Sequence, residues 1–315
     1  MAQVTTSADE STLYVATLAG DVIALARADG ARRWTRRLGE RAYATPLVTD
    51  DRVWVGTDAK KLVALDPASG SIVLALETTG EVDTAPVLAP NGLVIVAAGH
   101  EVLAVRRGGD IAWRHATRKK IFTAAALTAS GVVVVGGQDH AVHAITPDGN
   151  AAWTTDLGAD VDGGPVIGDD GALYVGTDAG EVVRLDDTGA VTWRAGVGGF
   201  VRGSLALARN GDVLAGTYGP VPRVVRVGAD GFVRGAFAIP GTGAKEFGIH
   251  GGPLEDAEGT LFFGTQDDAA YAIGRDGAVR WRFPTGADVD APLTLLADGA
   301  LVVPSEDGTV TLLVP

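Results

Sequence analysis

Short runs of hydrophobic residues alternate along the whole chain with turns rich in glycine, aspartate and asparagine. Residues 163–195 show the pattern clearly: four segments of four to six residues are rich in β-branched or aromatic side chains, and turn residues bound each segment. Such segments are typical of β-strands. Asn-Gly and Asp-Gly pairs supply the positive φ angles that two-residue hairpins need. No helical periodicity of useful length occurs, so we predict an all-β chain of consecutive hairpins.

This pattern repeats about every 40 residues. A four-residue segment such as Tyr14–Thr17 or Tyr174–Thr177 recurs eight times, and its third residue falls at positions 16, 56, 97, 136, 176, 216, 264 and 304. Four antiparallel strands in a repeat of this length are typical of β-propellers. We therefore predict a single domain over residues 1–315, an eight-bladed β-propeller of four-stranded antiparallel blades, with seven blades as the alternative.

We name the strands of each repeat A to D, outward from the expected axis. The first A strand is expected within the weak segment Gln3–Ser7, and the eighth repeat is expected to end after its C strand. The way in which the propeller closes therefore stays open at this point.

A tryptophan motif closes most of the repeats. A glycine of the last turn is followed four residues later by tryptophan, and the first repeat, for example, reads Ala24-x-Ala-x-x-Asp29-Gly30-x-x-x-Trp34. The tryptophans that fit are Trp34, Trp113, Trp153, Trp193 and Trp281, whereas Leu74 and Gly235 stand in this place in repeats two and six. The motif resembles the A-x-D-x-x-T-G-x-x-x-W docking motif of PQQ-like (quinoprotein or BamB-type) β-propeller repeats.

This resemblance implies a structural role for the five tryptophans, because in that family the indole docks between neighbouring blades. The family also includes quinoprotein dehydrogenases, which are considerably longer and commonly place a disulfide between adjacent cysteines against the quinone. This chain has no cysteine, only one long insertion and no recognisable calcium site. It also lacks the common hydrolase, nucleotide-binding and zinc-protease motifs. We therefore expect no cofactor, no metal and no catalytic residues.

Composition narrows the range of partners. The chain has 26 basic and 39 acidic residues, a formal net charge of −13, which argues against nucleic acid or an anionic membrane surface as the main partner. No apolar run approaches the length of a membrane span, and no signal peptide is expected at the start of this chain. Members of the family that the motif resembles are typically periplasmic. Because this precedent and the expected lack of a signal peptide point in different directions, the sequence leaves the localisation open.

Seven equivalent residues precede the A strands and form our candidate binding site. Because A strands line the axis of a propeller, these side chains should ring one mouth of the central channel. Convergent titratable groups in a concavity are a default site hypothesis. The candidates are Tyr43, Asp83, Phe122, Asp162, Arg202, His250 and Asp290.

The same face should carry the D–A and B–C loops, whose charges are unequal. Basic residues mark the early D–A loops: Arg36, Arg37, Arg41, Arg118, Lys119 and Lys120. Acidic residues mark the later D–A loops and the B–C loops: Asp156, Asp160, Asp162, Asp288 and Asp290, then Asp58, Asp139, Asp178, Asp267, Asp268, Glu306 and Asp307. We interpret this bipolar face as a docking surface for protein partners.

The third positions of the sixth and seventh repeats, 216 and 264, are 48 residues apart instead of about 40. This longer repeat contains the one clear insertion, within residues 239–250. Its Phe247 and Ile249 could cover the channel mouth or pack on the seventh blade. Taken together, the sequence predicts a non-catalytic protein-binding or scaffolding module. A sensor domain that binds a small ligand at the channel mouth is the alternative, and a PQQ-dependent dehydrogenase is the weakest one.

Overall fold

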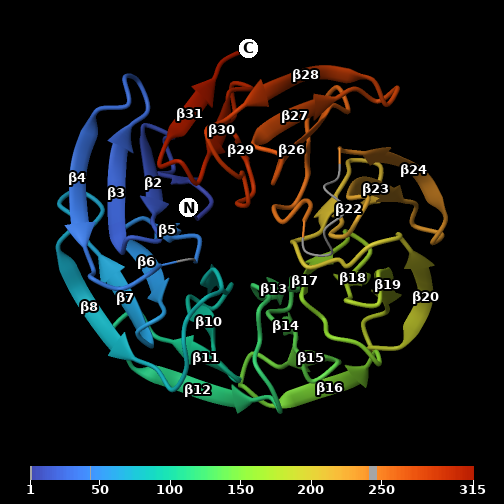
Figure 1. Cartoon of the computed structure of the whole chain (residues 1–315). Helices are drawn as coiled ribbons and strands as arrows, with labels where there is room; N and C mark the ends of the chain where they lie inside the picture. The colour runs from blue at the N-terminus through green and yellow to red at the C-terminus, as the bar shows by residue number, and fades with distance from the viewer. Residues whose placement is uncertain (1, 43, 241–246) are drawn as a thin grey trace. The chain divides into compact units, whose positions relative to one another are not determined.

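The computed structural model describes residues 2–42, 44–240 and 247–315 (Figure 1). The predicted fold class is confirmed, because the protein is an all-β, eight-bladed β-propeller with antiparallel blades. The chain divides into two compact units: the first unit is Met1–Val133 with Ile145–Ala151, and the second is Val134–Ala144 with Ala152–Pro315. The single domain over residues 1–315 stays a prediction.

The first unit contains three complete blades, each with its strands hydrogen-bonded in chain order. The first blade has β1 (Thr5–Thr6), β2 (Thr12–Ala16), β3 (Asp21–Ala26) and β4 (Arg32–Arg37). The second has β5 (Leu47–Thr49), β6 (Arg52–Thr57), β7 (Lys61–Leu65) and β8 (Ile72–Glu77). The third has β9 (Val87–Leu88), β10 (Val94–Ala98), β11 (Glu101–Val105) and β12 (Ile111–Ala116).

The fourth blade has β13 (Ala126–Leu127), β14 (Val133–Gly136), β15 (Ala141–Ile145) and β16 (Ala151–Asp156), and its residues are divided between the units. The second unit contains the remaining blades. The fifth has β17 (Gly163–Ile167), β18 (Leu173–Gly176), β19 (Glu181–Leu185) and β20 (Val191–Gly196). The sixth has β21 (Ala206–Leu207), β22 (Val213–Gly216), β23 (Arg223–Val227) and β24 (Val233–Ala238).

The seventh blade has β25 (Leu254–Glu255), β26 (Leu261–Thr265), β27 (Ala269–Ile273) and β28 (Val279–Pro284). The eighth has only β29 (Thr294–Leu295), β30 (Leu301–Pro304) and β31 (Val310–Leu313) among the described residues. As the sequence predicts, the part of the chain that the structure describes gives the eighth blade no D strand, and β1 occupies part of the expected Gln3–Ser7 segment.

Burial follows the position of a strand within its blade. The B and C strands are buried almost throughout, as in β10 and β15, because neighbouring blades cover both of their faces. The D strands, such as β16, alternate between exposed and half-buried residues, because they form the outer edge of each blade. This difference explains why the B and C strands read as continuous hydrophobic runs, whereas only the D strands alternate.

The insertion lies partly outside the described residues, which exclude 241–246. Ile249 at its end is fully buried and packs with Ile239, Phe263 and Tyr271. This side chain therefore packs on the seventh blade instead of covering the channel mouth. Phe247 is half-buried, and its carbonyl accepts a hydrogen bond from the Gly219 N–H. Within the described ranges, no helix has the length and apolar character needed to cross a membrane.

Candidate functional site

Each candidate site residue directly follows a buried aliphatic residue in the segment that joins a D strand to the next A strand, which we call the D–A segment. The N–H of the aliphatic residue donates to a carbonyl at the end of the preceding blade's B strand, as from Val201 to Thr177 (3.1 Å) and from Val289 to Thr265 (3.0 Å). The aliphatic residues are Ala42, Val82, Ile121, Val161, Val201, Ile249 and Val289. This bond fixes the backbone from which each of the described candidate side chains extends.

A glycine in the preceding B strand makes room for the aliphatic side chain. A Cβ added at Gly176 would overlap Val201 Cγ1 and lie 2.7 Å from Val201 Cβ. Gly56 faces Val82 and Gly264 faces Val289 in the same way. The recurring glycine at the third position of the repeat therefore reflects close packing between consecutive blades.

In the first unit, Asp83 and Phe122 meet around a lysine. The Lys120 Nζ lies 2.7 Å from Asp83 Oδ2 and 2.6 Å from Glu81 Oε2, and 4.5 Å from the centroid of the Phe122 ring. Burial lowers the pKa of Lys120, but its hydrogen bonds to Asp83 and Glu81 outweigh burial and raise the pKa. Tyr43, the other candidate in this unit, lies outside the described residues.

In the second unit, Asp162 and Arg202 belong to one cluster of charged groups. Arg202 binds both carboxylate oxygens of Asp178, with Nε 3.0 Å from Oδ1 and Nη2 2.8 Å from Oδ2. The carboxylates of Asp160, Asp162 and Asp178 each place an oxygen within 4.8 Å of the others. His140 Nε2 lies 3.2 Å from Asp160 Oδ1.

These three carboxylates have the oxygen ligands that a hard divalent cation such as Ca²⁺ takes. However, Arg202 already occupies both oxygens of Asp178, so a cation would have to compete with a bidentate guanidinium. The expectation of no bound metal stays a prediction.

Asp162 is the most perturbed group of this cluster. Its pKa is raised to about 6, first because burial disfavours the charged form and then because the Asp178 carboxylate lies close by. Since the folded pKa lies above the unfolded value near 3.8, the native state favours the protonated carboxyl. Ionisation of Asp162 therefore costs stability as the pH rises from about 4 to about 6.

We expect Asp162→Asn to become more stable relative to the wild type as the pH rises. The difference in the free energy of unfolding should increase by about 2 kcal/mol between pH 4 and pH 8, because asparagine cannot ionise. Urea unfolding at several pH values measures this difference. Asp186→Asn is the control: the Thr188 hydroxyl and the Ala190 N–H lower the pKa of Asp186, so its titration lies below pH 4 and the stability difference should hardly change between pH 4 and pH 8. A difference for Asp162→Asn that does not change with pH would contradict the prediction.

His250 and Asp290 meet in a second cluster of the same unit. Burial raises the pKa of Asp290, while the charge of His250 and a hydrogen bond from Gln266 act against this shift. The exposed His250 ring packs edge-on against Tyr218, with 5.6 Å between the ring centroids. Next to them, the pKa of Asp288 is raised to about 6 by burial and by the carboxylates of Asp290 and Asp268.

The structure thus groups the candidates by neighbours: Asp83 with Phe122, Asp162 with Arg202, and His250 with Asp290. The complete seven-membered ring stays a prediction. The three candidate aspartates share one further property. Asp83, Asp162 and Asp290 each have a buried Oδ1 that accepts no hydrogen bond from the described part of the chain.

Four of the five motif tryptophans make the same contact with the following blade. Their Nε1 donates to a backbone carbonyl of its C–D turn at 2.8–2.9 Å: Trp34 to Pro67, Trp113 to Pro147, Trp153 to Asp187 and Trp193 to Ala229. Each ring also covers a glycine of this turn; a Cβ at Gly70, for example, would lie 2.5 Å from Trp34 Cε3. These contacts support a docking role.

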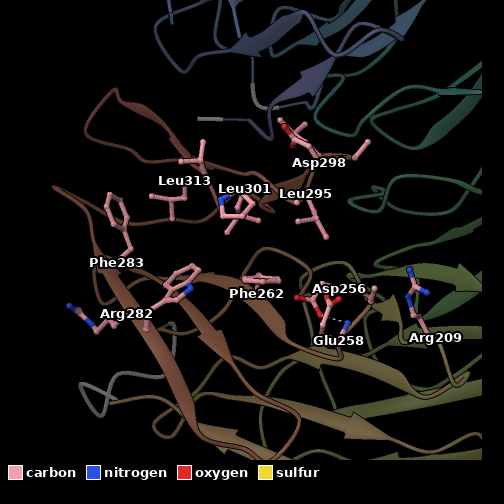
Figure 2. A pocket seen from close by; sticks show the side chains of 17 residues that line it. Arg209, Asp256, Glu258, Phe262, Arg282, Phe283, Leu295, Asp298, Leu301 and Leu313 are labelled. Atoms are coloured by element: carbon pink, nitrogen blue, oxygen red, sulfur yellow. Dashed lines mark hydrogen bonds between the residues drawn. The ribbon is translucent and has the colours of Figure 1, made fainter. Parts of the chain in front are cut away.

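Trp281 lies in a different environment. Its indole packs against Phe262 with the two rings tilted by 36° and 5.9 Å between the centroids, and it borders a pocket of about 830 Å³ between the seventh and eighth blades. In Figure 2, Phe262, Leu295 and Leu301 line the apolar part of this pocket, whereas Arg209, Asp256 and Glu258 lie together at one end. Arg282 and Asp298 also line the pocket, which therefore combines apolar and charged groups.

Sequence reasoning missed two polar groups beside the B–C turns. His143 Nε2 lies 3.1 Å from both carboxylate oxygens of the buried Asp139. Tyr271 donates to Asp267 at 2.6 Å and accepts from Arg282 Nε at 3.0 Å. The sequence contains a signal for both groups, because an aspartate stands four residues before His143 and before Tyr271. Asp139 and Asp267 therefore support the B–C turns and do not form a solvated acidic surface.

The predicted charge asymmetry of the loops is reduced by pairing in the first unit. Arg36 and Arg37 lie in β4 and not in the D–A loop where they are expected from the sequence. Arg41 lies 3.8 Å from Asp58, and Lys120 pairs with Asp83 and Glu81. In the second unit, Asp268 and Glu306 are exposed and Asp288 is half-buried. Carboxylates therefore dominate the loops of the second unit.

Comparisons with known proteins agree with this architecture. A family model described as "Outer membrane protein assembly factor BamB" matches residues 2–59, 50–147 and 138–231. The crystal structure of BamB from Moraxella catarrhalis is similar, with a TM-score of 0.83 and 20% identity over 98% of this chain and 95% of that chain. The computationally designed Ika8 protein has a TM-score of 0.82 and 15% identity over 99% of this chain and 95% of that chain.

At these identities the two structures show the fold alone. A comparison with curated protein sequences gives no significant match. The family model, however, matches more than half of the chain. The chain therefore belongs to the PQQ-like β-propeller repeat family whose model is described as outer membrane protein assembly factor BamB.

Proposed function

We propose that this protein is a non-catalytic protein-binding or scaffolding module whose partner contacts the D–A and B–C loops. The observation that carries the proposal is the group of carboxylates Asp268, Asp288, Asp290 and Glu306, which we call the acidic loop cluster. Membership of the BamB family is consistent with a partner protein. No step of the proposal requires a bound cofactor.

The acidic loop cluster is electrostatically unfavourable in the isolated protein. Burial and the carboxylates of Asp290, Asp268 and Glu306 raise the pKa of Asp288, so the ionised cluster destabilises itself at neutral pH. A positively charged partner segment would replace this repulsion by attraction. Complementary charge of this kind also increases the association rate and fixes orientation. We therefore propose a basic surface or segment on the partner protein.

The proposal is tested with a lysine- and arginine-rich peptide as the probe. We expect the peptide to bind and the affinity to fall steeply with added salt. Replacement of Asp268 and Asp288 by asparagine should weaken binding by about tenfold. The matched control replaces Asp170 and Asp186, which lie in an A–B and a C–D turn, by asparagine. Equal weakening by both double variants, or no binding at all, would contradict the proposal.

A second candidate function is a sensor domain that binds a small ligand at the channel mouth. The specific support lies in the second unit, where Asp162 and Asp290 each have a buried Oδ1 without a donor among the described residues, since buried acceptors normally have a donor. A ligand with hydrogen-bond donors, such as an amine or a polyol, would satisfy these oxygens. Replacing Asp162 by asparagine should then change ligand binding without changing peptide binding to the acidic loop cluster, which does not contain Asp162.

The family also includes PQQ-dependent enzymes, and an absorbance spectrum distinguishes that function. We expect the purified protein to give the same quinone spectrum as buffer when PQQ and Ca²⁺ are added. A shifted, saturable quinone band would contradict a non-catalytic function.

A further inference from the structure

The docking contact between the sixth and seventh blades has no tryptophan indole. In repeat six, Gly235 stands where the other D strands have tryptophan or leucine, and it pairs with Arg226 in the position where Trp193 pairs with Arg184. A Cβ at Gly235 would meet no atom within 4 Å. The turn glycine of the following blade, Gly277, likewise has nothing within 4 Å and is exposed.

The turn that would receive the indole is otherwise unchanged. Gly277 has φ +79°, close to the values of Gly149 (+88°), Gly189 (+84°) and Gly231 (+84°), which all lie under a tryptophan. In repeats four, five and six, the carbonyl that accepts the indole N–H belongs to the residue two before the turn glycine. The equivalent acceptor in repeat seven is the carbonyl of Arg275.

A cavity occupies the place of the missing ring. It has a volume of about 280 Å³ and lies between β24 of the sixth blade and the C–D turn of the seventh. Its lining combines apolar and charged groups, which include Val224, Phe237, Leu261, Arg234, Arg275 and Asp276. The Asp276 carboxylate is paired with Arg280. Arg234 is paired with Asp230. Arg275 has no carboxylate partner among the residues that the structure describes.

We propose that this cavity, which we call the indole socket, binds a tryptophan side chain presented by another polypeptide. The four docked tryptophans of this chain show what such a socket accepts: a planar ring over the turn glycine and an N–H donated to a turn carbonyl. The unpaired guanidinium of Arg275 favours an acidic residue beside that tryptophan. The socket lies away from the D–A and B–C loops, so this inference does not rest on the proposed function.

Filling the socket within the chain tests its shape. Gly235→Trp should place its ring as Trp193 does and raise the midpoint temperature of unfolding by about 2–4 °C relative to Gly196→Trp. Gly196 is a matched control, because it also lies on a D strand, is exposed and has no atom within 4 Å of an added Cβ. A lower midpoint for Gly235→Trp than for Gly196→Trp would show that the cavity does not fit an indole.

Binding in trans is tested with a capped Asp-Trp-Asp peptide and a capped Asp-Ala-Asp peptide. In NMR titrations of the protein, we expect saturable shifts of the Gly235, Arg275 and Gly277 amides with the tryptophan peptide alone, at a millimolar dissociation constant. The shifts should disappear in Gly235→Trp and persist in Gly196→Trp. No shift up to the solubility limit, or equal shifts in both variants, would overturn the proposal, whatever the result at the acidic loop cluster.

Discussion

Trp54→Ala is expected to lower the free energy of unfolding by about 3–5 kcal/mol, as deletions of fully buried aromatic side chains do. Trp54 lies in β6, is only 1% exposed and packs in a cluster with Leu62, Val82 and Leu103. It is the one tryptophan outside the docking motif. Urea unfolding followed by circular dichroism gives the free energy.

Trp153→Ala provides the comparison for this substitution. Trp153 is half-buried on a D strand, and its replacement removes the hydrogen bond to Asp187 and part of the ring's apolar contact. We expect a smaller loss of about 1–3 kcal/mol. If Trp153→Ala costs as much as Trp54→Ala or more, the inner B strand does not contribute more to stability than the outer docking contact.

Gly176→Ala is expected to cost about 2–3 kcal/mol, because the added methyl group would overlap the Val201 side chain. Val201 cannot move away easily, since its N–H is hydrogen-bonded to Thr177 and its side chain packs in the core cluster of the fifth and sixth blades. Thermal or urea unfolding measures the loss.

Gly196→Ala in the same blade is the matched control. An added Cβ there meets nothing within 4 Å, and the backbone does not have a positive φ. We expect this variant to be as stable as the wild type or slightly more stable, because alanine reduces the entropy of the unfolded chain. Equal losses for the two variants would mean that the effect of Gly176→Ala arises from the strand itself and not from contact with Val201.

The repeat spacing was sufficient to predict the fold. The glycine at positions such as 56, 176 and 264 marks the B strand, and the glycine–tryptophan spacing marks the C–D turn and D strand. Both signals are local, because each depends on a steric or hydrogen-bonding requirement that recurs in most of the blades. The same register also predicts the three strands that the described residues form in the eighth blade.

The groups within the candidate site were less predictable. Repeat register identified Asp162 and Arg202 as equivalent positions, but it did not show that Arg202 binds Asp178 or that Asp160 joins the cluster. Lys120 similarly pairs with Asp83 across 37 residues of sequence. Which partner a long side chain reaches depends on its rotamer and on burial, and neither is encoded in the spacing of the repeats.

The glycine that replaces the motif tryptophan at position 235 shows another feature that the sequence alone does not predict. A glycine in the tryptophan position reads as a degenerate motif, and only the empty space at both Gly235 and Gly277 shows that the neighbouring residues have not filled the gap. The packing around a missing side chain depends on how far the surrounding backbone can relax. Here the turn keeps the conformation that it has in the other repeats.

The backbone bonds of the D–A segments affect how the molecule can open locally. In the second unit, Asp160 accepts a bond from Asp178 in its own fifth blade, while Val161 donates to Gly137 in the fourth; Phe200 and Val201 repeat this arrangement with Tyr218 and Thr177. Because one segment completes the hydrogen bonding of two successive blades, freeing a blade also exposes backbone groups of its neighbour. We therefore expect the smallest cooperative opening unit to be larger than one blade, with slow amide exchange that extends through these connections instead of stopping at each blade.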